Sequence, residues 1–256
     1  MSRETVLTDV RTLYAQLSRG DDIVVLSVGP ATEGIPGALA VDPTAFAGAG
    51  GGLKGARPLP EIADLQQAVR QWGIGNDTPV VLYDSNGNVT SARGWWTLKW
   101  AGLTHVRLLD GGLAAWEEAG LPFARLEPAR GGGTATLSPG HLAEIDADGA
   151  ADYAARHVLI DARAARAFDQ GYIAGAVNLP ANGNLDANDR FLSDERLRER
   201  YASICDHKIA VSCGSGVSAA HDIAALAIIG IEAALFVGSW SAWSADPTRP
   251  VVAQAA

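Results

Sequence analysis

Cysteine is scarce in this sequence: only Cys205 and Cys213 occur among its 256 residues. Two cysteines do not make the disulfide framework of a small secreted protein, which favours a reducing compartment. The five histidines are scattered, and neither Cys-x-x-Cys nor His-Glu-x-x-His occurs, which argues against a structural or catalytic zinc site. We therefore expect no metal ion in this protein.

Positive charge and long apolar runs are also scarce. The chain has 20 Lys and Arg against 29 Asp and Glu, a formal net charge of −9, so it lacks the basic face that nucleic acids and anionic membranes require. No apolar run approaches the roughly 20 residues that span a bilayer. The N-terminal MSRETVLTDV carries charges of both signs and does not resemble a secretory signal. We expect a cytoplasmic protein without nucleic-acid or membrane partners.

The sequence does contain an internal repeat, because three pairs of segments recur in the same order in its two halves. They are the apolar runs 23–27 and 158–161, the glycine-containing turns 34–38 and 172–176, and the strand-like runs 79–84 and 208–213. In each half a glycine-containing loop and a helical stretch follow the third segment, so strands and helices alternate. This alternation predicts an α/β fold with two domains, each a parallel sheet flanked by helices.

The stretch between the two halves is the most linker-like part of the chain. Residues 126–140 contain two prolines and a run of three glycines. We therefore predict one domain at residues 1–125, a linker at 126–140 and a second domain at 141–256. Three ordered matches on either side of a linker argue against a single large α/β domain. Another glycine- and proline-rich loop, residues 45–60, is expected to run over the surface of the first half.

The segment that indicates chemistry joins a strand to a helix in the second half. The strand is expected to end at Ser212 and the helix to begin near Gly216 or Val217, so Cys213 lies just before the helix N-terminus. The free amides and the dipole at that point favour an anion. Gly214 and Gly216 let the loop curl so that several amides face inward. A thiol held there loses its proton more easily, and the thiolate is the nucleophile.

The two cysteines differ in their surroundings, and the Cys213 loop also bears on phosphate chemistry. Cys205 precedes the strand without neighbouring glycines and is interpreted as structural, whereas glycines on a strand-to-helix loop favour a functional Cys213 over an inert one. A cysteine phosphatase, or an enzyme handling arsenate, needs an arginine six positions after the cysteine to close the loop around the anion. That position is Ala219, so phosphate chemistry is disfavoured.

Several motifs resemble those of the tandem rhodanese family, which includes thiosulfate and 3-mercaptopyruvate sulfurtransferases. They are the loop 213–218, the segments 238–247, 176–180 and 109–116, and Arg93-Gly94-Trp95-Trp96. The resemblance implies two similar domains of which only the second keeps a catalytic cysteine, and Asp84 stands at the position of Cys213 in the first half. It further implies that Cys213 takes sulfur from a small donor, carries it as a persulfide and passes it to cyanide, a small thiol or a thioredoxin-like protein. No cofactor is implied.

The resemblance also implies which residues bind the donor. They are the loop residues Gly214, Ser215, Gly216, Val217 and Ser218, together with an arginine near the start of the second domain. The family position of that arginine falls on Ala167, so the adjacent Arg166 or the nearby Arg163 is the candidate here. The uncharged loop is more similar to the mercaptopyruvate branch than to the thiosulfate branch, and both donors stay open.

The sequence departs from the family pattern at several positions. Gly34 and Tyr172 stand where the family usually has histidine, and Ser27 and Gly29 replace an aspartate and an arginine after the first strand. These departures motivate an alternative function, a low-turnover persulfide carrier or regulatory binding module on the same scaffold. His221, two turns beyond the cysteine, is expected to be too distant for direct contact with it.

Overall fold

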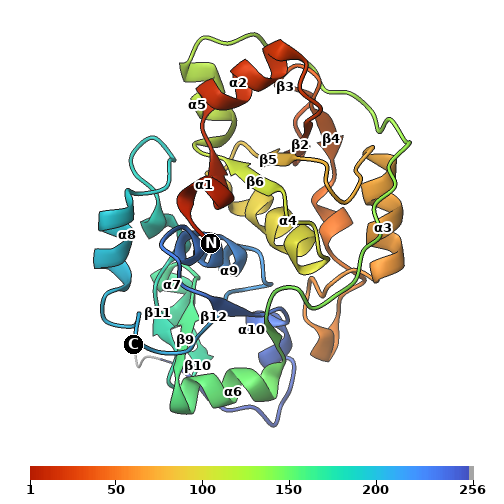
Figure 1. The fold of residues 1–256 in the computed structure, drawn as a ribbon. Coiled ribbons are helices and arrows are strands. Elements are labelled where there is room, and N and C mark those ends of the chain that lie inside the picture. Colours follow the sequence, from red (N-terminus) through yellow and green to blue (C-terminus); the bar gives the residue numbers. More distant parts are fainter. Residues whose placement is uncertain (254–256) are drawn as a thin grey trace.

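Two five-stranded parallel sheets organise the computed structural model, which describes residues 1–253 (Figure 1). The strands of the first sheet are β1 (Leu7–Thr8), β2 (Val24–Val28), β4 (Leu39–Val41), β5 (Val80–Tyr83) and β6 (Val106–Leu109). Those of the second are β8 (Glu144–Ile145), β9 (Val158–Asp161), β11 (Val177–Asn178), β12 (Ile209–Ser212) and β13 (Ala233–Phe236). We call the parts of the chain built on these sheets the first and the second unit.

The second sheet repeats the first strand by strand. The spatial order is β1-β6-β5-β2-β4 in one and β8-β13-β12-β9-β11 in the other. An antiparallel pair accompanies each sheet: β3 (Glu33–Gly34) with β7 (Ala124–Arg125), and β10 (Tyr172–Ile173) with β14 (Val251–Val252). The predicted duplication and the α/β fold with two parallel sheets are therefore confirmed.

Helices cover both faces of each sheet, and this explains why the central strands are continuous apolar runs. Every residue of β5 and β12 is buried, as expected for parallel strands between two layers of helices. The helices are α1 (Arg3–Val6), α2 (Val10–Arg19), α3 (Ile62–Gln71), α4 (Val89–Trp100), α5 (Gly112–Glu118), α6 (Ala147–Arg156), α7 (Ala165–Asp169), α8 (Asp194–Tyr201), α9 (Ser218–Ile228) and α10 (Ser239–Trp243), with 3-10 turns η1 (Pro43–Phe46), η2 (Gly52–Lys54) and η3 (Ala181–Asn184).

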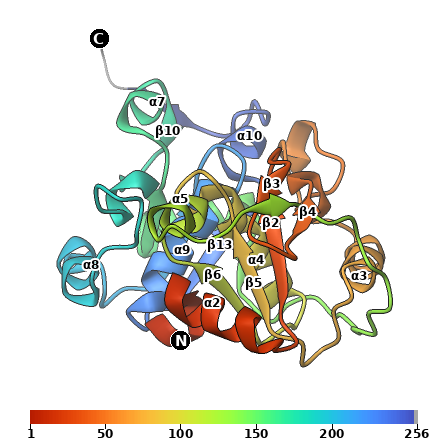
Figure 2. The same cartoon turned by 90° about the horizontal axis from the view of Figure 1, so that it is seen from above.

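The two units meet through α4 and α9, which pack against each other between the sheets (Figures 1 and 2). Every residue of α9 after Ser218 is buried, and most of α4 is buried as well. A helix that is buried on all sides needs neighbours all round, and here the sheet and the opposite unit supply them. One continuous apolar core, which includes Trp96 of α4 and Leu226 of α9, therefore crosses from one unit to the other.

The connection between the units is ordered, although its composition is typical of a flexible linker. Its amides donate to carbonyls of the first unit, among them Glu127 N to Ala38 O at 2.8 Å and Gly133 N to Arg70 O at 2.9 Å. Ala135, within the connection, is buried. The backbone of residues 126–140 is thus tied to the first unit, and the predicted domain boundaries stay predictions.

The loop at residues 45–60 does not simply run over the surface of the first unit, as its composition predicted. Its glycine-rich tip is exposed, but Gly55 approaches the second unit so closely that a Cβ there would lie 2.6 Å from Gly238 O. Beside it, Ala56 N donates to Ser241 Oγ at 2.9 Å. Glycine permits this backbone-to-backbone approach, and the loop therefore bridges the two units. No helix within residues 1–253 is long and apolar enough to cross a membrane.

Candidate active site

Two equivalent loops follow the central strands of the two sheets. Asp84 follows β5 and Cys213 follows β12, each at the carboxyl edge of its sheet and before the helix that packs at the interface. The predicted strand end at Ser212 is confirmed. The helix begins at Ser218, one residue beyond the predicted start at Gly216 or Val217. The repeat in the sequence therefore corresponds to two equivalent loops, one of which begins with Asp84 and the other with Cys213.

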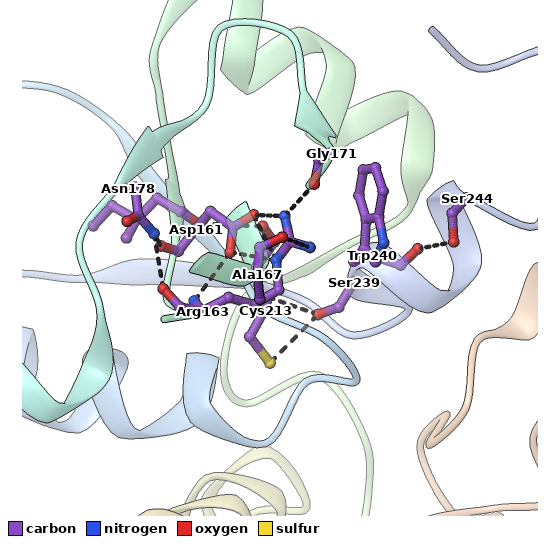
Figure 3. Close-up of polar contacts among 11 residues, drawn as sticks. Asp161, Arg163, Ala167, Gly171, Asn178, Cys213, Ser239, Trp240 and Ser244 are labelled. Carbon is purple, nitrogen blue, oxygen red and sulfur yellow. Dashed lines mark hydrogen bonds and ion pairs between the residues drawn. The ribbon is translucent and has the colours of Figure 1, made fainter. Parts of the chain in front are cut away.

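The sulfur of Cys213 is enclosed by its own loop and by the turn after β13. Gly216 N donates to Cys213 Sγ at 3.1 Å, and the hydroxyl of Ser239 lies 4.0 Å from the same sulfur (Figure 3). The backbone is held as well, because Cys213 N donates to Ser239 Oγ and Trp240 N donates to Cys213 O. Only 1% of the residue is exposed. The residue therefore presents almost no surface to solvent.

The Asp84 loop shows what the same backbone does around an anion. Asp84 Oδ1 accepts hydrogen bonds from the amides of Asn86 and Asn88, and Oδ2 accepts from those of Thr90 and Ser91, all at 2.8 Å. Successive inward amides of this kind make an anion-binding concavity. The first unit fills its own concavity with a carboxylate, which explains why it needs no ligand there.

Two of the four corresponding amides of the Cys213 loop are free, whereas Ala220 N, at the position of Ser91, donates to Val217 O at 3.1 Å. Ser215 and Val217 stand where Asn86 and Asn88 stand in the first unit, and their amides donate to no atom within residues 1–253. The loop glycine has the same left-handed conformation in both units, with φ 57° at Gly87 and 78° at Gly216. The Cys213 loop therefore offers donors for an anion that its own side chain does not occupy.

Ser239 is a site residue that the sequence alone did not single out. It is fully buried and has φ 50°, although a non-glycine residue rarely adopts this conformation. The equivalent residue of the first unit is Gly112, with φ 55°. The hydroxyl of Ser239 donates to Phe236 O at 2.8 Å and accepts from Cys213 N at 3.1 Å. Comparison of the two halves of the sequence could have identified Ser239, because the first half has Gly112 at this position.

Arg163, one of the two candidate donor contacts, is engaged within the protein. Its guanidinium forms an ion pair with Asp161 (Nη2 to Oδ2, 2.6 Å) and donates to the carbonyls of Ala167 and Gly171 (Figure 3). It also lies 4.6 Å from the ring centroid of Trp240. Its bonds hold the turn after β9 against α10, and its expected contact with the donor stays a prediction.

Arg166, the other candidate, lies on α7, which follows β9 at the same edge of the sheet as Cys213. Its side chain is exposed and has no hydrogen bond or ion pair with any residue from 1 to 253. It is therefore available to a ligand, while nothing places it in contact with the sulfur. Cys205 is also exposed, in the turn that follows α8, and its thiol donates to Ala202 O.

Arg93 of α4 is a second residue that sequence reasoning missed, although its motif was noted. It is 3% exposed and donates to carbonyls of both units: Nη1 to Gly216 O at 3.2 Å, Nη2 to Arg57 O at 3.2 Å and Nε to Phe46 O at 3.3 Å. Burial lowers the pKa of Arg93 to about 10, and the charge of the Cys213 thiolate opposes that shift. The side chain therefore stays a cation at neutral pH.

His221 lies in the interior and contacts the Asp84 loop of the first unit rather than the Cys213 loop. Its Nε2 is 3.1 Å from Gly87 O in the first unit, and its ring stacks on Phe191 with 4.6 Å between ring centroids. Burial lowers the pKa of His221 to about 4, so the ring is neutral and Nε2 donates to the carbonyl. His221 has no hydrogen bond to Cys213 in the described part of the chain. Within the same residues no three His, Cys, Asp or Glu gather as metal ligands.

Comparison with known proteins agrees with the repeat. The family profile of the rhodanese-like domain matches twice, at residues 3–119 and 141–246. "Putative thiosulfate sulfurtransferase SseB" of Mycobacterium tuberculosis is 42% identical over 218 residues, which cover 77% of this chain and 75% of the relative. "Probable 3-mercaptopyruvate sulfurtransferase" of Pseudomonas aeruginosa is 37% identical over 224 residues (78% and 76%). The crystal structure of SseA, a 3-mercaptopyruvate sulfotransferase from Escherichia coli, superposes with a TM-score of 0.81 at 25% identity and covers 93% of this chain and 99% of that one.

Proposed function

The chain belongs to the rhodanese family and is a sulfurtransferase, and we propose that it moves a sulfane sulfur from 3-mercaptopyruvate or thiosulfate to a thiophilic acceptor through a persulfide on Cys213. The observation that carries the proposal is the loop itself. A thiol lies between a buried strand and a helix N-terminus, with one amide on its sulfur and the amides of Ser215 and Val217 free. Such a loop favours the thiolate and a second negative sulfur beyond it.

The proposed reaction has two displacements. The Cys213 thiolate attacks the transferable sulfur of the donor and forms an S–S bond. The bond between that sulfur and the rest of the donor breaks, and the leaving group keeps its electron pair. Thiosulfate releases sulfite in this way, and 3-mercaptopyruvate releases the enolate of pyruvate, which is then protonated. The acceptor, which is cyanide, a small thiol or a thioredoxin-like protein, then attacks the outer sulfur, and the electron pair of the S–S bond returns to Cys213. No oxidant and no cofactor is consumed.

The Asp84 loop supports the assignment of the donor-binding residues. Its four amide bonds show how this backbone satisfies a carboxylate, and the persulfide is an anion at the equivalent position. We therefore propose that the segment 214–218 binds the transferred sulfur and the donor mainly through backbone amides. Because Arg166 is exposed at the same sheet edge, we propose it as the contact for the carboxylate or sulfonate of the donor. Arg163 acts indirectly, by fixing the turn that leads to α7.

Intact mass tests this function on a Cys205→Ser background, which removes the exposed thiol. We expect the protein to gain one sulfur atom after incubation with 3-mercaptopyruvate or thiosulfate, and to lose it when cyanide or a thiol is added. The matched Cys205→Ser/Cys213→Ser protein should gain none. If Cys213 gains no sulfur from either donor, the proposal is wrong.

A low-turnover persulfide carrier is the second candidate, and the enclosure of the sulfur favours it. With 1% of Cys213 exposed, the opening of the site limits entry of a free donor, whereas a partner protein could supply sulfur by binding first. Steady-state turnover separates the two. Many cycles with a small donor and cyanide support the enzyme, and a single loading with little turnover supports the carrier. The cytoplasm as compartment stays a prediction.

A further inference from the structure

Arg93 is a buried cation without a carboxylate partner. It forms no ion pair with any Asp or Glu in residues 1–253, and its nitrogens are bonded to neutral carbonyls, those of Phe46, Arg57, Pro58 and Gly216. A charge removed from water is costly unless an opposite charge or full hydrogen bonding compensates for it. Carbonyl oxygens compensate in part for the buried charge of Arg93, so an anion close to it would stabilise it further.

The geometry answers with the cysteine loop. Arg93 Nη1 lies so close to Gly216 that a Cβ on this glycine would be 2.9 Å from it, and Gly216 N is the amide that donates to Cys213 Sγ. The charged groups that act on Arg93 are few. The Cys213 thiolate and, more weakly, Glu144 of β8 favour its charged form, and Arg57 of the loop 45–60 opposes it. The Asp161–Arg163 pair at the end of β9 is neutral as a whole.

We propose that Arg93 is the positioning residue and counter-charge of the catalytic sulfur, so that a cation of the first unit completes the site of the second. This inference rests on the proposed function of Cys213. Arg93 fixes the Gly216 carbonyl, which aims the Gly216 amide at the sulfur, and its positive charge favours the thiolate and the persulfide over the thiol. The first unit, which has no cysteine of its own at this position, thereby contributes to the chemistry directly.

The pseudo-symmetry of the molecule provides an internal control. Nine residues separate Asp84 from Arg93, and nine separate Cys213 from Asp222, so the counterpart of Arg93 on α9 is an acid. The neighbouring His221, which is neutral, holds the Gly87 carbonyl in its place. A carboxylate is already an anion at neutral pH, and four amides satisfy it. A thiol has to lose its proton before it becomes an anion. The cation is thus found only opposite the loop that has to create its charge.

A pH titration separates this electrostatic role from a merely structural one. The absorbance of the thiolate near 240 nm is followed in a Cys205→Ser background, with Cys205→Ser/Cys213→Ser as the blank. Arg93→Met keeps much of the side-chain volume without the charge, and Arg93→Lys keeps the charge without the planar fork. Arg70→Met is the matched control, because Arg70 also donates from a first-unit helix to a carbonyl, that of Ala135, away from the cysteine.

We expect the rise of thiolate absorbance to move to higher pH in Arg93→Met, because removing the cation that is bonded to the cysteine loop disfavours the ionised form. Arg93→Lys should lie between this variant and the background, and Arg70→Met should match the background. An unchanged titration in a folded Arg93→Met protein overturns the proposal. The measurement involves no sulfur donor, so its result is independent of whether Cys213 forms a persulfide.

The native side chain gives a second test in case Arg93→Met does not fold. In ¹⁵N-labelled Cys205→Ser protein, the Nε–Hε signal of Arg93 should shift across the pH range in which the thiolate absorbance appears. The shift should be absent in Cys205→Ser/Cys213→Ser, in which no charge forms. A signal that responds equally in both proteins contradicts the pairing of Arg93 with the sulfur.

Discussion

Arg93 Nη1 of the first unit lies 3.2 Å from the carbonyl oxygen of Gly216 in the second. The equivalent carbonyl of the first unit, Gly87 O, lies 3.1 Å from Nε2 of His221 in the second unit. Each strand-end loop is therefore held by the interface helix of the opposite unit. These contacts are reciprocal, since α4 bonds the loop of the second unit and α9 bonds the loop of the first.

Alanine should lower the stability of the protein at Gly216 but not at Gly214, although both glycines lie in the same loop. Gly216 has φ 78°, and a Cβ there would lie 2.7 Å from Val237 O and 2.9 Å from Arg93 Nη1, so Gly216→Ala must displace the loop or its neighbours. We expect it to cost about 2 kcal/mol or more of unfolding free energy and most of the sulfur loading. Gly214→Ala adds a Cβ with no atom within 4 Å and should unfold at nearly the same urea concentration as the parent. Equal midpoints for the two variants would contradict this account.

Ser239 combines an unfavourable backbone conformation with two buried hydrogen bonds, and two substitutions separate these effects. Ser239→Ala keeps the strain and leaves Cys213 N and Phe236 O without their partner, which should cost about 1–3 kcal/mol in urea unfolding. Ser239→Gly loses the same bonds but tolerates φ 50°, so it should be about 1 kcal/mol more stable than Ser239→Ala. If the alanine variant proves the more stable of the two, the strain is not real.

The two arginines near the start of the second unit should respond differently to truncation. Arg163→Ala leaves Asp161 buried without its ion pair and is expected to cost about 3–5 kcal/mol of stability. Arg166→Ala removes an exposed side chain and should leave stability nearly unchanged, while KM for an anionic donor rises several-fold and kcat changes little. An unaltered KM in Arg166→Ala would remove this residue from the proposed donor site.

A buried pair on α9 predicts how stability depends on pH. Burial raises the pKa of Asp222 to about 8, and burial lowers the pKa of His221 to about 4. The folded state therefore keeps a proton on Asp222 up to about pH 8 that the unfolded state releases near pH 4, so this group stabilises the fold less as pH rises between these values. His221 contributes in the opposite direction between pH 4 and 6.5, where the unfolded state binds the extra proton.

Above pH 6.5 only the Asp222 contribution varies, so stability should fall by about 2 kcal/mol between pH 6.5 and 8. Asp222→Asn imitates the protonated acid, because Asn184 Nδ2 can still donate to its Oδ1 and the other oxygen of Asp222 has no partner within residues 1–253. Urea unfolding at several pH values should show the decline in the parent and a flatter profile in Asp222→Asn. The same slope in both proteins would place the titrating group elsewhere.

The sequence predicted what depends on local pattern. Apolar runs between glycine-containing turns located the central strands, and the repeat of these runs predicted the duplicated α/β fold. The end of β12 at Ser212 followed from the same signals, because a buried parallel strand reads as one continuous apolar segment. The loop around Cys213 was recognisable since a strand end, two glycines and a helix start are adjacent in the chain.

What the sequence did not reveal depends on contacts between distant segments. Arg93 is 120 residues from Cys213, and only the packing of α4 on α9 brings it to the Gly216 carbonyl. The docking of Gly55 on Gly238 likewise depends on the way the two units meet. Composition suggested a flexible connection at residues 126–140, but hydrogen bonds to the first unit, which no local pattern encodes, fix its course.

Since every residue of α9 after Ser218 is buried and most of α4 is buried as well, each half of this molecule depends on the other for cover. Producing either half alone would expose the buried residues of its interface helix, and we expect such a fragment to aggregate. Because α4 and α9 pack directly on each other, we expect a chimera between relatives to fold best when both helices are exchanged together.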